Sequence, residues 1–458
     1  MKKLLNNKFL SLILVIVLLT SLTVSVYSKT TTIEWATIGG FYTDWMNKVA
    51  QKYTEQTGVK IDIVQIDNAV MYEKQGIEMA SHTGVYDLVT NESMWRAEWA
   101  YAGFIVPLDD MIAKYGMLED MKNFDPFTLK LSGMWNGKIY SLPYYTYNQG
   151  MFIREDLFNN TIEKVAFKEK YGEELRKPDN WDYFYKVAEF FTRKKGETLK
   201  GKVLEKPFFG VGLMAGRYPE IQDEFMAMLW GNGGDVMDGN FNAVVNSNIG
   251  VATMEYYTKL LDNCAPPGAR SSSYDGVIAQ LNDNIIAMTG PMFLDQWANA
   301  VKTEDIVPGA RVKAIDTPLK KGYVGAFGIS ITADSRQKEE AFKFLQFLMS
   351  KEIQKDFALG GGSTIRLDVL TDPEVISPAN RKKTGGFPTL VEMMKLQKDA
   401  DYTIFDSPAA GKIYEEMMIH CNMAANHEVS CKKAMDLLAE KIDELNKPYK
   451  NIIDKLKR

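Results

Sequence analysis

Short apolar runs alternate with amphipathic segments near the start of this chain, and this order limits the folds that it can form. Residues 33–38, 60–66 and 86–90 are rich in apolar and β-branched side chains and predict strands. Residues 41–56 and 73–82, which lie between them, predict helices. Strands separated by helices are typical of a mostly parallel sheet with helices on both faces, so an α/β fold is expected.

Two of these strands end in residues that are suited to bind a ligand. Gly39-Gly40 follows the first strand, and Asn91-Glu92-Ser93 follows the third. Ligands of open α/β sheets bind outside the carboxyl ends of the strands, where loops present backbone and polar groups. We therefore expect a binding site at this edge of the sheet.

Residues 1–28 have the pattern of a secretory signal peptide. Lysines precede an apolar run over residues 9–19, and small residues that include Ser28 stand where cleavage would occur. The run is shorter than the roughly 20 residues that span a bilayer, so a permanent anchor is the weaker interpretation. No cysteine lies near the predicted cleavage site, which argues against a lipid anchor. We expect an exported, periplasmic protein that is cleaved near Ser28.

Length and charge narrow the possible functions further. A chain of 458 residues is long for a single core and predicts two lobes. Its 54 Lys and Arg residues against 59 Asp and Glu residues give a net charge of −5. Because the sequence has no basic stripe to neutralise phosphates, nucleic acid is not an expected partner. A small solute that is not strongly anionic fits this balance better.

The chain has three cysteines, and an oxidising compartment would allow a disulfide. Cys421 and Cys431 flank the loop between two helical patterns, so a bridge between them is predicted. Two buried thiols are the alternative, because spacing alone does not fix the geometry. Cys264 would remain a buried free thiol. None of the three has a neighbouring sequence that suggests catalysis.

The segment from residue 322 to residue 367 combines a glycine-punctuated strand, an amphipathic helix and a glycine-rich loop. Asp334 and Ser335 cap the start of the helix, and its apolar side chains recur every three or four residues. Gly360-Gly361-Gly362 ends the helical pattern that follows. This block resembles the hallmark region of the family 1 extracellular solute-binding proteins, which are the carbohydrate-binding components of ABC importers.

Further blocks that resemble this family follow one another along the chain in the family's order. The segment that begins at Gly137 is similar to the one in which the chain of this family first crosses between the lobes. The segment that contains Trp181 is similar to the start of the helix that follows this crossing in the family. An ordered series of blocks is more specific than any single block. The blocks are residues 137–158, 177–192, 224–238, 242–261 and 286–297, with a pair of terminal helices over residues 411–445.

The resemblance implies the two-lobe (type II) periplasmic binding protein fold. Each lobe would be a mostly parallel sheet flanked by helices, with the ligand cleft between the lobes. The crossing segments are expected to act as hinges that close the lobes around a ligand. The family's crossing points, mapped onto this sequence, give a first lobe of residues 29–146 plus 291–333 and a second lobe of residues 147–290 plus 334–458.

A neutral sugar has hydroxyls around its ring and apolar C–H patches on its faces. Its binding site needs polar groups for the hydroxyls and aromatic rings for the faces. Core packing is the alternative for each aromatic residue, a helix N-terminal charge for Glu92, and a salt bridge for Arg366. The candidate ligand-binding residues are Gly40, Tyr42, Asn91, Glu92, Trp95, Tyr144, Tyr145, Tyr147, Arg217, Tyr218, Trp230, Met292, Phe293, Phe327, Thr364 and Arg366.

Sequence signals of an enzyme are weak. His82, His420 and His427 are the only histidines, and none has metal-ligand spacing to a second His or Cys. The glycine-rich runs lack the Lys-Ser/Thr of a phosphate-binding loop. Asp109-Asp110 opens a predicted helix and fits a capping role better than a glycosidase carboxylate pair. We therefore predict no catalytic residue, no metal and no cofactor.

The resemblance implies a monomeric periplasmic protein that binds a mono- or oligosaccharide and delivers it to the permease of an ABC transporter. Phe327 stands where the family often has Trp, and Met292 stands where an aromatic residue is frequent, so the sugar stays open. A polyol or another polar solute is the alternative ligand. A secreted carbohydrate-active enzyme is the alternative from a different class, because two carboxylates can meet from distant parts of a chain.

Overall fold

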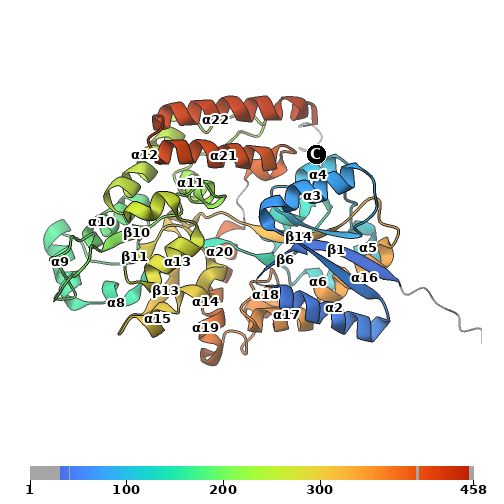
Figure 1. The fold of residues 1–458 in the computed structure, drawn as a ribbon, viewed down its shortest axis with the longest axis horizontal. Helices are drawn as coiled ribbons and strands as arrows, with labels where there is room; N and C mark the ends of the chain where they lie inside the picture. Colours follow the sequence, from blue (N-terminus) through green and yellow to red (C-terminus); the bar gives the residue numbers. More distant parts are fainter. Residues whose placement is uncertain (1–30, 41, 399–401, 453–458) are drawn as a thin grey trace, which may run out of the picture.

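Two α/β lobes lie side by side in the computed structural model, which describes residues 31–40, 42–398 and 402–452 (Figure 1). Each lobe is built on its own sheet, which confirms the predicted two-lobe α/β fold. The predicted signal peptide, residues 1–28, lies outside the described residues. Within the three described ranges, every helix is too short or too polar to span a bilayer.

The first lobe contains a five-stranded sheet with the order β2-β1-β3-β14-β6. β1 (Thr32–Ile38) pairs in parallel with β2 (Lys60–Ile66) and with β3 (Leu88–Glu92). β14 (Ala326–Ile331) lies between β3 and β6 (Leu142–Thr146) and runs antiparallel to both. The carboxyl end of β3 therefore lies beside segments from two later parts of the chain.

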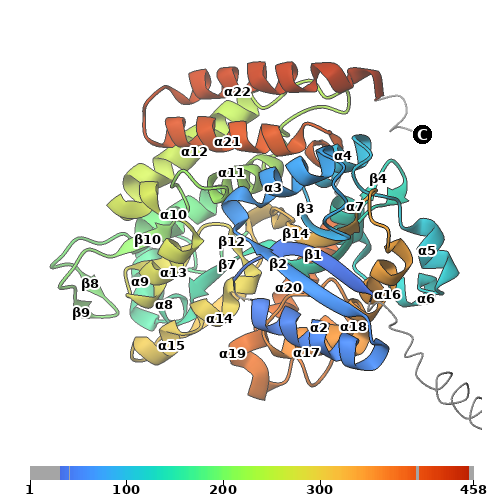
Figure 2. The same ribbon diagram turned by 45° about the vertical axis from the view of Figure 1, so that its right-hand side comes forward.

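Helices cover both faces of this sheet (Figure 2). Buried apolar side chains of α2 (Thr43–Thr57) and α16 (Lys338–Leu348) belong to one core with the strands. α2 ends at Gly58, whose φ of 75° favours glycine. The other elements of this lobe are α3 (Asn68–Ala80), α4 (Arg96–Tyr101), α5 (Asp109–Lys114), α6 (Leu118–Met121), α7 (Pro126–Gly133), β4 (Met134–Trp135), β5 (Lys138–Ile139) and α17 (Lys351–Leu359).

The second lobe contains a mixed sheet with the order β10-β11-β7-β12. β10 (Phe209–Gly212) pairs in parallel with β11 (Ile286–Thr289). β7 (Gln149–Arg154) runs antiparallel to β11, to β12 (Met292–Phe293) and to β13 (Val312–Ile315). Both sheets are thus mixed rather than mostly parallel as predicted, because β14 and β7 run against their neighbours.

Polar residues cap several helices around this sheet. Asn180 accepts a hydrogen bond from Tyr183 N (2.8 Å) at the start of α10 (Trp181–Phe191). Ser247 caps α12 (Asn248–Asn263) in the same way. The other elements of this lobe are α8 (Glu155–Phe158), α9 (Thr161–Tyr171), β8 (Thr198–Leu199), β9 (Lys202–Val203), α11 (Glu220–Gly231), α13 (Tyr274–Asn282), α14 (Trp297–Ala300), α15 (Thr303–Ile306), α18 (Leu367–Leu370), α19 (Arg381–Thr384), α20 (Phe387–Gln397), α21 (Ala410–Ala425) and α22 (Cys431–Asn446).

The described chain passes between the lobes three times, and the first two crossing segments run side by side. The first leads from β6 to β7, and the second leads from β13 to β14. Tyr147 N donates to Gly325 O (2.9 Å), and Gln149 N donates to Tyr323 O (2.9 Å). These backbone hydrogen bonds hold the two segments together, which is the arrangement expected of a paired hinge.

The predicted division of the chain differs from this packing at three points. Residues 312–315, which were expected in the first lobe, form β13 of the second sheet. The apolar side chains of α16, which were expected in the second lobe, belong to the core of the first. The return crossing was expected at Gly290-Pro291, but this pair connects β11 to β12 within one sheet. We propose a first lobe of residues 31–146 plus 326–365 and a second lobe of residues 147–325 plus 366–452.

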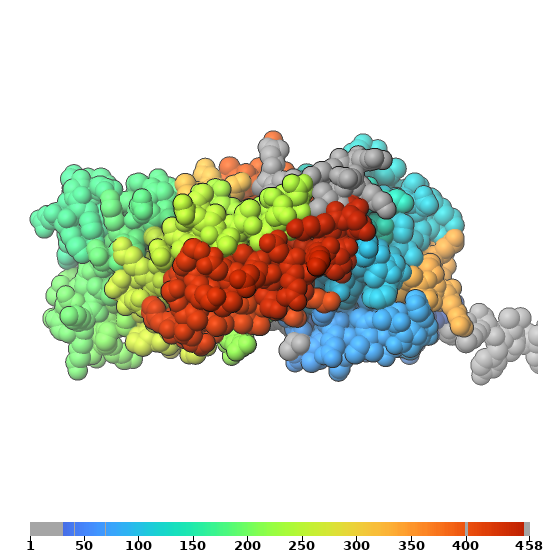
Figure 3. All heavy atoms as spheres, turned by 90° about the horizontal axis from the view of Figure 1, so that it is seen from above, coloured from blue at the N-terminus to red at the C-terminus, as the bar shows by residue number. Residues whose placement is uncertain are grey.

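The carboxy-terminal part of the chain contacts both lobes. In the first lobe, Arg96 donates to Phe405 O (2.7 Å) and Trp135 Nε1 donates to Asp406 O (3.1 Å). α21 and α22 then pack on α11 and α12 of the second lobe. Figure 3 shows these helices, in red, lying across the second lobe and reaching the first. We call residues 402–411 the C-terminal strap.

The predicted disulfide between Cys421 and Cys431 is not formed. Cys264, Cys421 and Cys431 are all free thiols. Cys431, at the start of α22, lies 3.7 Å from Thr258 Oγ1 of α12, whereas Cys421 is fully buried within α21. Burial raises the pKa of the Cys421 thiol. The Cys431 thiol lies near enough to Cys421 to add to this rise, although no bond joins them.

Candidate functional site

Glu92 stands at the carboxyl end of β3 and contacts both crossing segments. Its Oε1 accepts hydrogen bonds from the hydroxyls of Tyr147 (2.7 Å) and Tyr323 (2.9 Å). Its Oε2 accepts from Met94 N (2.7 Å), which ties the carboxylate to the turn before α4. Burial raises the pKa of Glu92, and these hydrogen bonds oppose the rise. The end of β3 thus holds a buried carboxylate against both crossing segments.

Asp223 brings a second carboxylate to the same place from the second lobe. It lies in the first turn of α11 and accepts a hydrogen bond from the hydroxyl of Tyr414 (2.6 Å). Burial raises the pKa of Asp223 well above its usual range, and the negative charges of Glu92 and Glu220 add to the rise. Because Tyr414 belongs to α21, the carboxy-terminal helices contribute to this site.

A third carboxylate, that of Asp295, follows β12. Its Oδ2 accepts a hydrogen bond from the hydroxyl of Tyr145 in β6, and its Oδ1 is buried without a hydrogen-bond partner among the described residues. Burial raises the pKa of Asp295 to about 6. Tyr42, just before α2, lies edge-on to Tyr145 with ring centroids 4.8 Å apart. A buried acceptor without a partner is suited to a donor that arrives with a ligand.

Aromatic rings connect these carboxylates. The centroid of the Tyr147 ring lies 5.7 Å from that of Tyr145 and 5.5 Å from that of Phe327. Tyr323 and Tyr414 are stacked, with centroids 6.0 Å apart. We call the whole set the interlobe cluster, and its members are Tyr42, Glu92, Tyr145, Tyr147, Asp223, Phe293, Asp295, Tyr323, Phe327 and Tyr414.

The structure brings part of the predicted set together in this cluster. Tyr42, Glu92, Tyr145 and Tyr147 lie there, as does Phe327 with Phe293. The predicted Gly40, Arg217 and Tyr218 are exposed in loops at the ends of β1 and before α11.

Other predicted residues have partners elsewhere. Asn91 Oδ1 accepts hydrogen bonds from the hydroxyls of Ser141 (2.9 Å) and Ser330 (2.9 Å) inside the first sheet. Tyr144 and Met292 are fully buried in the cores of the first and second lobes. These side chains are therefore buried within the lobes.

Arg366 forms ion pairs. A salt bridge was the alternative role that we considered for this residue from the sequence. Its guanidinium is 1% exposed and donates to Asp120 (2.6 Å) and Asp368 (3.0 Å). Thr364 Oγ1 accepts from the backbone N of Arg366 (3.2 Å), so it stabilises the same turn. Neither residue belongs to the interlobe cluster.

Trp230, which was predicted to stack on a ligand, lies outside the interlobe cluster. It stacks on Tyr402 of the C-terminal strap, with centroids 3.8 Å apart and an interplanar angle of 17°, and its Nε1 donates to Asp235 (3.0 Å). Trp95 packs against Trp99 with centroids 5.7 Å apart. The Gly-rich turn after Trp230 suggested that the Trp230 ring would be accessible to a ligand, but the C-terminal strap covers this ring.

Four members of the interlobe cluster were not predicted from the sequence: Asp223, Asp295, Tyr323 and Tyr414. Acidic residues in the first turn of an otherwise apolar helix could have indicated Asp223. Tyr323 stands between two glycines of the second crossing, which is a similar signal to the one that indicated Tyr147. Tyr414 had no local signal, because its partner Asp223 is 191 residues away along the chain.

Glu224 gives this lobe a measurable pH dependence. It is fully buried beside Asp223, and its Oε2 accepts from the hydroxyl of Tyr257 (2.6 Å) and from Met214 N (2.9 Å). Burial raises its pKa from 4.5 to about 8. Since the folded state binds this proton more tightly, the contribution of Glu224 to the free energy of unfolding is fully present below about pH 4.5 and is lost as the pH rises through about 8.

Glu224→Gln should remove this contribution. We expect its unfolding free energy to decline less steeply between pH 5 and pH 8, by up to ~1.4 kcal/mol per pH unit, measured by urea denaturation. Glu444→Gln, on the exposed face of α22, is the matched control and should keep the original slope. Equal slopes in the Glu224→Gln variant and the original protein would contradict a neutral, buried Glu224.

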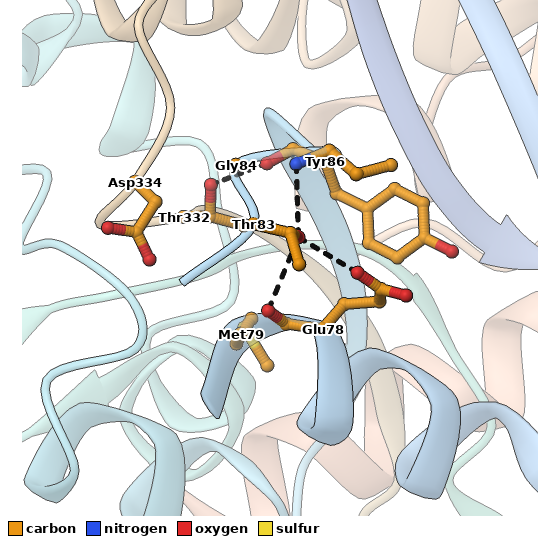
Figure 4. A pocket seen from close by; sticks show the side chains of 8 residues that line it. Glu78, Met79, Thr83, Gly84, Tyr86, Thr332 and Asp334 are labelled. Carbon is orange, nitrogen blue, oxygen red and sulfur yellow. Dashed lines mark hydrogen bonds between the residues drawn. The ribbon is translucent and has the colours of Figure 1, made fainter. Parts of the chain in front are cut away.

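A shallow hollow on the first lobe is too small to be the main site (Figure 4). It measures about 10 Å³, which is the space of roughly one water. Thr83 Oγ1 donates to Glu78 Oε2 (2.8 Å) across it. Its lining residues are Glu78, Met79, Thr83, Gly84, Val85, Tyr86, Thr332 and Asp334.

Residues 40–355 match the family model described as bacterial extracellular solute-binding protein. A probable amino-acid ABC transporter periplasmic-binding protein of Sinorhizobium fredii is 22% identical over 342 residues, which cover 73% of this chain and 72% of the relative. The mannitol-binding protein of Pseudomonas aeruginosa is 20% identical over 324 residues, which cover 68% of this chain and 67% of the relative.

Solved structures share the fold over nearly the whole chain. An ABC transporter solute-binding protein of Agrobacterium radiobacter K84 in complex with ribitol has a TM-score of 0.74 at 21% identity, covering 91% of this chain and 98% of that one. Maltose-bound MalE3 of T. maritima has a TM-score of 0.72 at 18% identity, covering 91% and 100%. At these identities the likeness concerns the fold.

Proposed function

This chain belongs to the bacterial extracellular solute-binding proteins, and we propose that it binds a hydroxyl-rich solute, a sugar or a polyol, between its lobes. The interlobe cluster carries the proposal, because it joins carboxylates and aromatic rings of both lobes at the crossing segments. Carboxylates accept hydrogen bonds from hydroxyls, and aromatic rings pack on C–H faces.

Relatives with stated ligands support this class of solute. The similar structures contain ribitol and maltose, and one curated relative is a mannitol-binding protein. Polyols and sugars present the same hydroxyl donors to a carboxylate, so one cluster suits both.

An amino acid, suggested by the name of the Sinorhizobium fredii relative, suits the cluster less well. The carboxylate of an amino acid needs a cationic partner or several N–H donors. Among the described residues, no Lys or Arg lies within 4.0 Å of the carboxylates of Glu92, Asp223 or Asp295. Such a carboxylate would therefore meet like charges.

We propose that the lobes bend about the paired crossings and close on the solute. Glu92 of the first lobe and Asp223 of the second would bind its opposite sides, so the bound solute favours the closed form. The closed protein would then deliver the solute to the permease of an ABC transporter. Removal of residues 1–28 on export to the periplasm, a monomeric state and the absence of catalytic turnover complete the proposal.

A panel of ribitol, D-mannitol, D-glucitol, D-tagatose and maltose tests this function. We expect at least one of them to raise the melting temperature, because a ligand at 100 times its Kd stabilises the folded state by about 2.7 kcal/mol. Titration calorimetry would then give the Kd. No shift with any hydroxyl-rich solute, neutral or amine-bearing, would contradict the proposal, and new products in chromatography would favour the carbohydrate-active enzyme instead.

A further inference from the structure

The carboxylates of the interlobe cluster have neutral hydrogen-bond donors. Tyrosine hydroxyls donate to Glu92, Asp223 and Asp295, and none of these carboxylates forms an ion pair with Lys or Arg in the part of the chain that the structure describes. Arg96 is a buried cation near Glu92, and its guanidinium donates to backbone oxygens that include Phe405 O. Among the described residues, the three carboxylates therefore outnumber this one buried cation, Arg96.

Two of these carboxylates come from different lobes and influence each other. The charge of Glu92, at the end of β3, helps to raise the pKa of Asp223 in α11. Buried carboxylates that lie close together cannot both ionise without repulsion, unless a cation lies near both. A positive group between the lobes would therefore relieve this repulsion and favour closure.

Tyrosine rings border the same two carboxylates. The Tyr323 ring is stacked on that of Tyr414, with centroids 6.0 Å apart, and lies 6.3 Å from that of Tyr147. The faces of aromatic rings attract organic cations, and this attraction strengthens where water is excluded. Rings and carboxylates together match an alkylammonium group better than a neutral hydroxyl.

Two further polar atoms at this junction have no partner among the described residues. One is Asp295 Oδ1, which is buried. The other is Nε2 of Gln149, a fully buried side chain whose Oε1 accepts from Tyr323 N (3.0 Å). An unpaired acceptor and an unpaired donor suit a ligand that also carries hydroxyls, because each hydroxyl can donate and accept.

A metal ion matches these groups poorly. Across residues 31–40, 42–398 and 402–452, no group of three or more His, Cys, Asp or Glu side chains could hold one. Calcium takes six to eight oxygen ligands, whereas tyrosine rings occupy much of the surroundings of Glu92 and Asp223. An organic cation needs fewer oxygen ligands and can use the rings.

We infer that the ligand carries a protonated amine among its hydroxyls, as an amino sugar or an aminopolyol does. Its ammonium group binds between Glu92 and Asp223, and its hydroxyls bind towards Asp295 and Gln149. This inference rests on the proposed function and narrows its class of ligand.

Titration calorimetry at pH 7 with matched ligand pairs tests the inference. One pair is 1-amino-1-deoxy-D-glucitol with D-glucitol, and the other is 2-amino-2-deoxy-D-glucose with D-glucose. We expect the amine to bind at least about tenfold more tightly than its neutral partner in one pair, which corresponds to about 1.4 kcal/mol. N-acetyl-D-glucosamine, which has lost the charge, should lose the advantage of the amino sugar.

The outcomes separate this inference from the proposed function. If the neutral member binds as tightly as the amine, or if only neutral solutes of the earlier panel bind, the inference is overturned and the proposed function stands. If neither the amines nor any panel member binds, both are overturned.

Two variants locate the ammonium group. Asp223→Asn should reduce the ratio of the neutral Kd to the amine Kd by about tenfold, and Glu92→Gln should do the same from the other lobe. Asp305→Asn is the control, because Asp305 pairs with Lys382 on the surface (2.7 Å), and it should keep the ratio. If Asp223→Asn does not fold, Glu92→Gln decides alone. An unchanged ratio in the folded variants overturns the placement.

Discussion

Replacing Glu92 with glutamine is expected to weaken solute binding by roughly 10- to 150-fold. The Glu92 carboxylate is buried at the hinge and is held by the hydroxyls of Tyr147 and Tyr323, so it meets a ligand donor without reorganising. Glutamine keeps the shape but removes the charge, and a hydrogen bond to a charged group contributes about 1.5–3 kcal/mol. Titration calorimetry with the strongest binder of the panel measures the loss.

Glu98→Gln is the matched control for this experiment. Glu98 also accepts a hydrogen bond from a tyrosine, Tyr72, but it lies on α4 outside the interlobe cluster. This variant should bind the solute like the original protein. Near-native affinity in Glu92→Gln would contradict a ligand-binding role and would leave Glu92 with the structural role of fixing Met94 N.

Gly210→Ala is expected to destabilise the second lobe by at least ~3 kcal/mol. A Cβ atom at Gly210 of β10 would lie 1.8 Å from the backbone oxygen of Ala188 in α10. Overpacking in a core costs 1–3 kcal/mol when side chains can adjust, and here the strand or the helix backbone must move. Since β10 leads into the loop before α11, the same shift should disturb Asp223. Urea denaturation and solute titration measure the two effects.

Gly76→Ala provides the contrast. Gly76 lies inside α3, and a Cβ atom there would have no heavy atom within 4 Å except those of its chain neighbours and of the backbone of its own helix. Alanine should raise the unfolding free energy by roughly 0.5–1 kcal/mol, because glycine weakens a helix interior. If Gly210→Ala were as stable as Gly76→Ala, the close approach of β10 to α10 would not exist in solution.

Helices and strands that show a clear periodicity of apolar residues were predicted correctly from the sequence. The strand and helix order over residues 33–90 corresponds to β1, α2, β2, α3 and β3, because each element shows its own periodicity. Phe293 after Gly290-Pro291 and Tyr147 after a proline-containing run were expected in turns. The structure places both at the junction of the lobes, as ring neighbours 5.6 Å apart.

Features that depend on contacts between distant residues could not be predicted. The apolar stripe of α16 shows that one face is buried, but its period does not show which lobe covers it. Trp230 has a partner in Tyr402, far along the chain, that no neighbouring residue indicates. The same holds for Glu92 and Asp223, because these two carboxylates come from different lobes and influence each other only when the lobes are assembled.

The tail of the chain has a consequence for how solute preference can change. The family model ends at residue 355, whereas Tyr414 and the C-terminal strap lie beyond it. Asp223 therefore receives its hydroxyl donor from a segment outside the part of the chain that matches the family model. If Asp223 binds the solute as we propose, substitutions in the last two helices would change the solute preference while both sheets and the crossing segments keep their sequence.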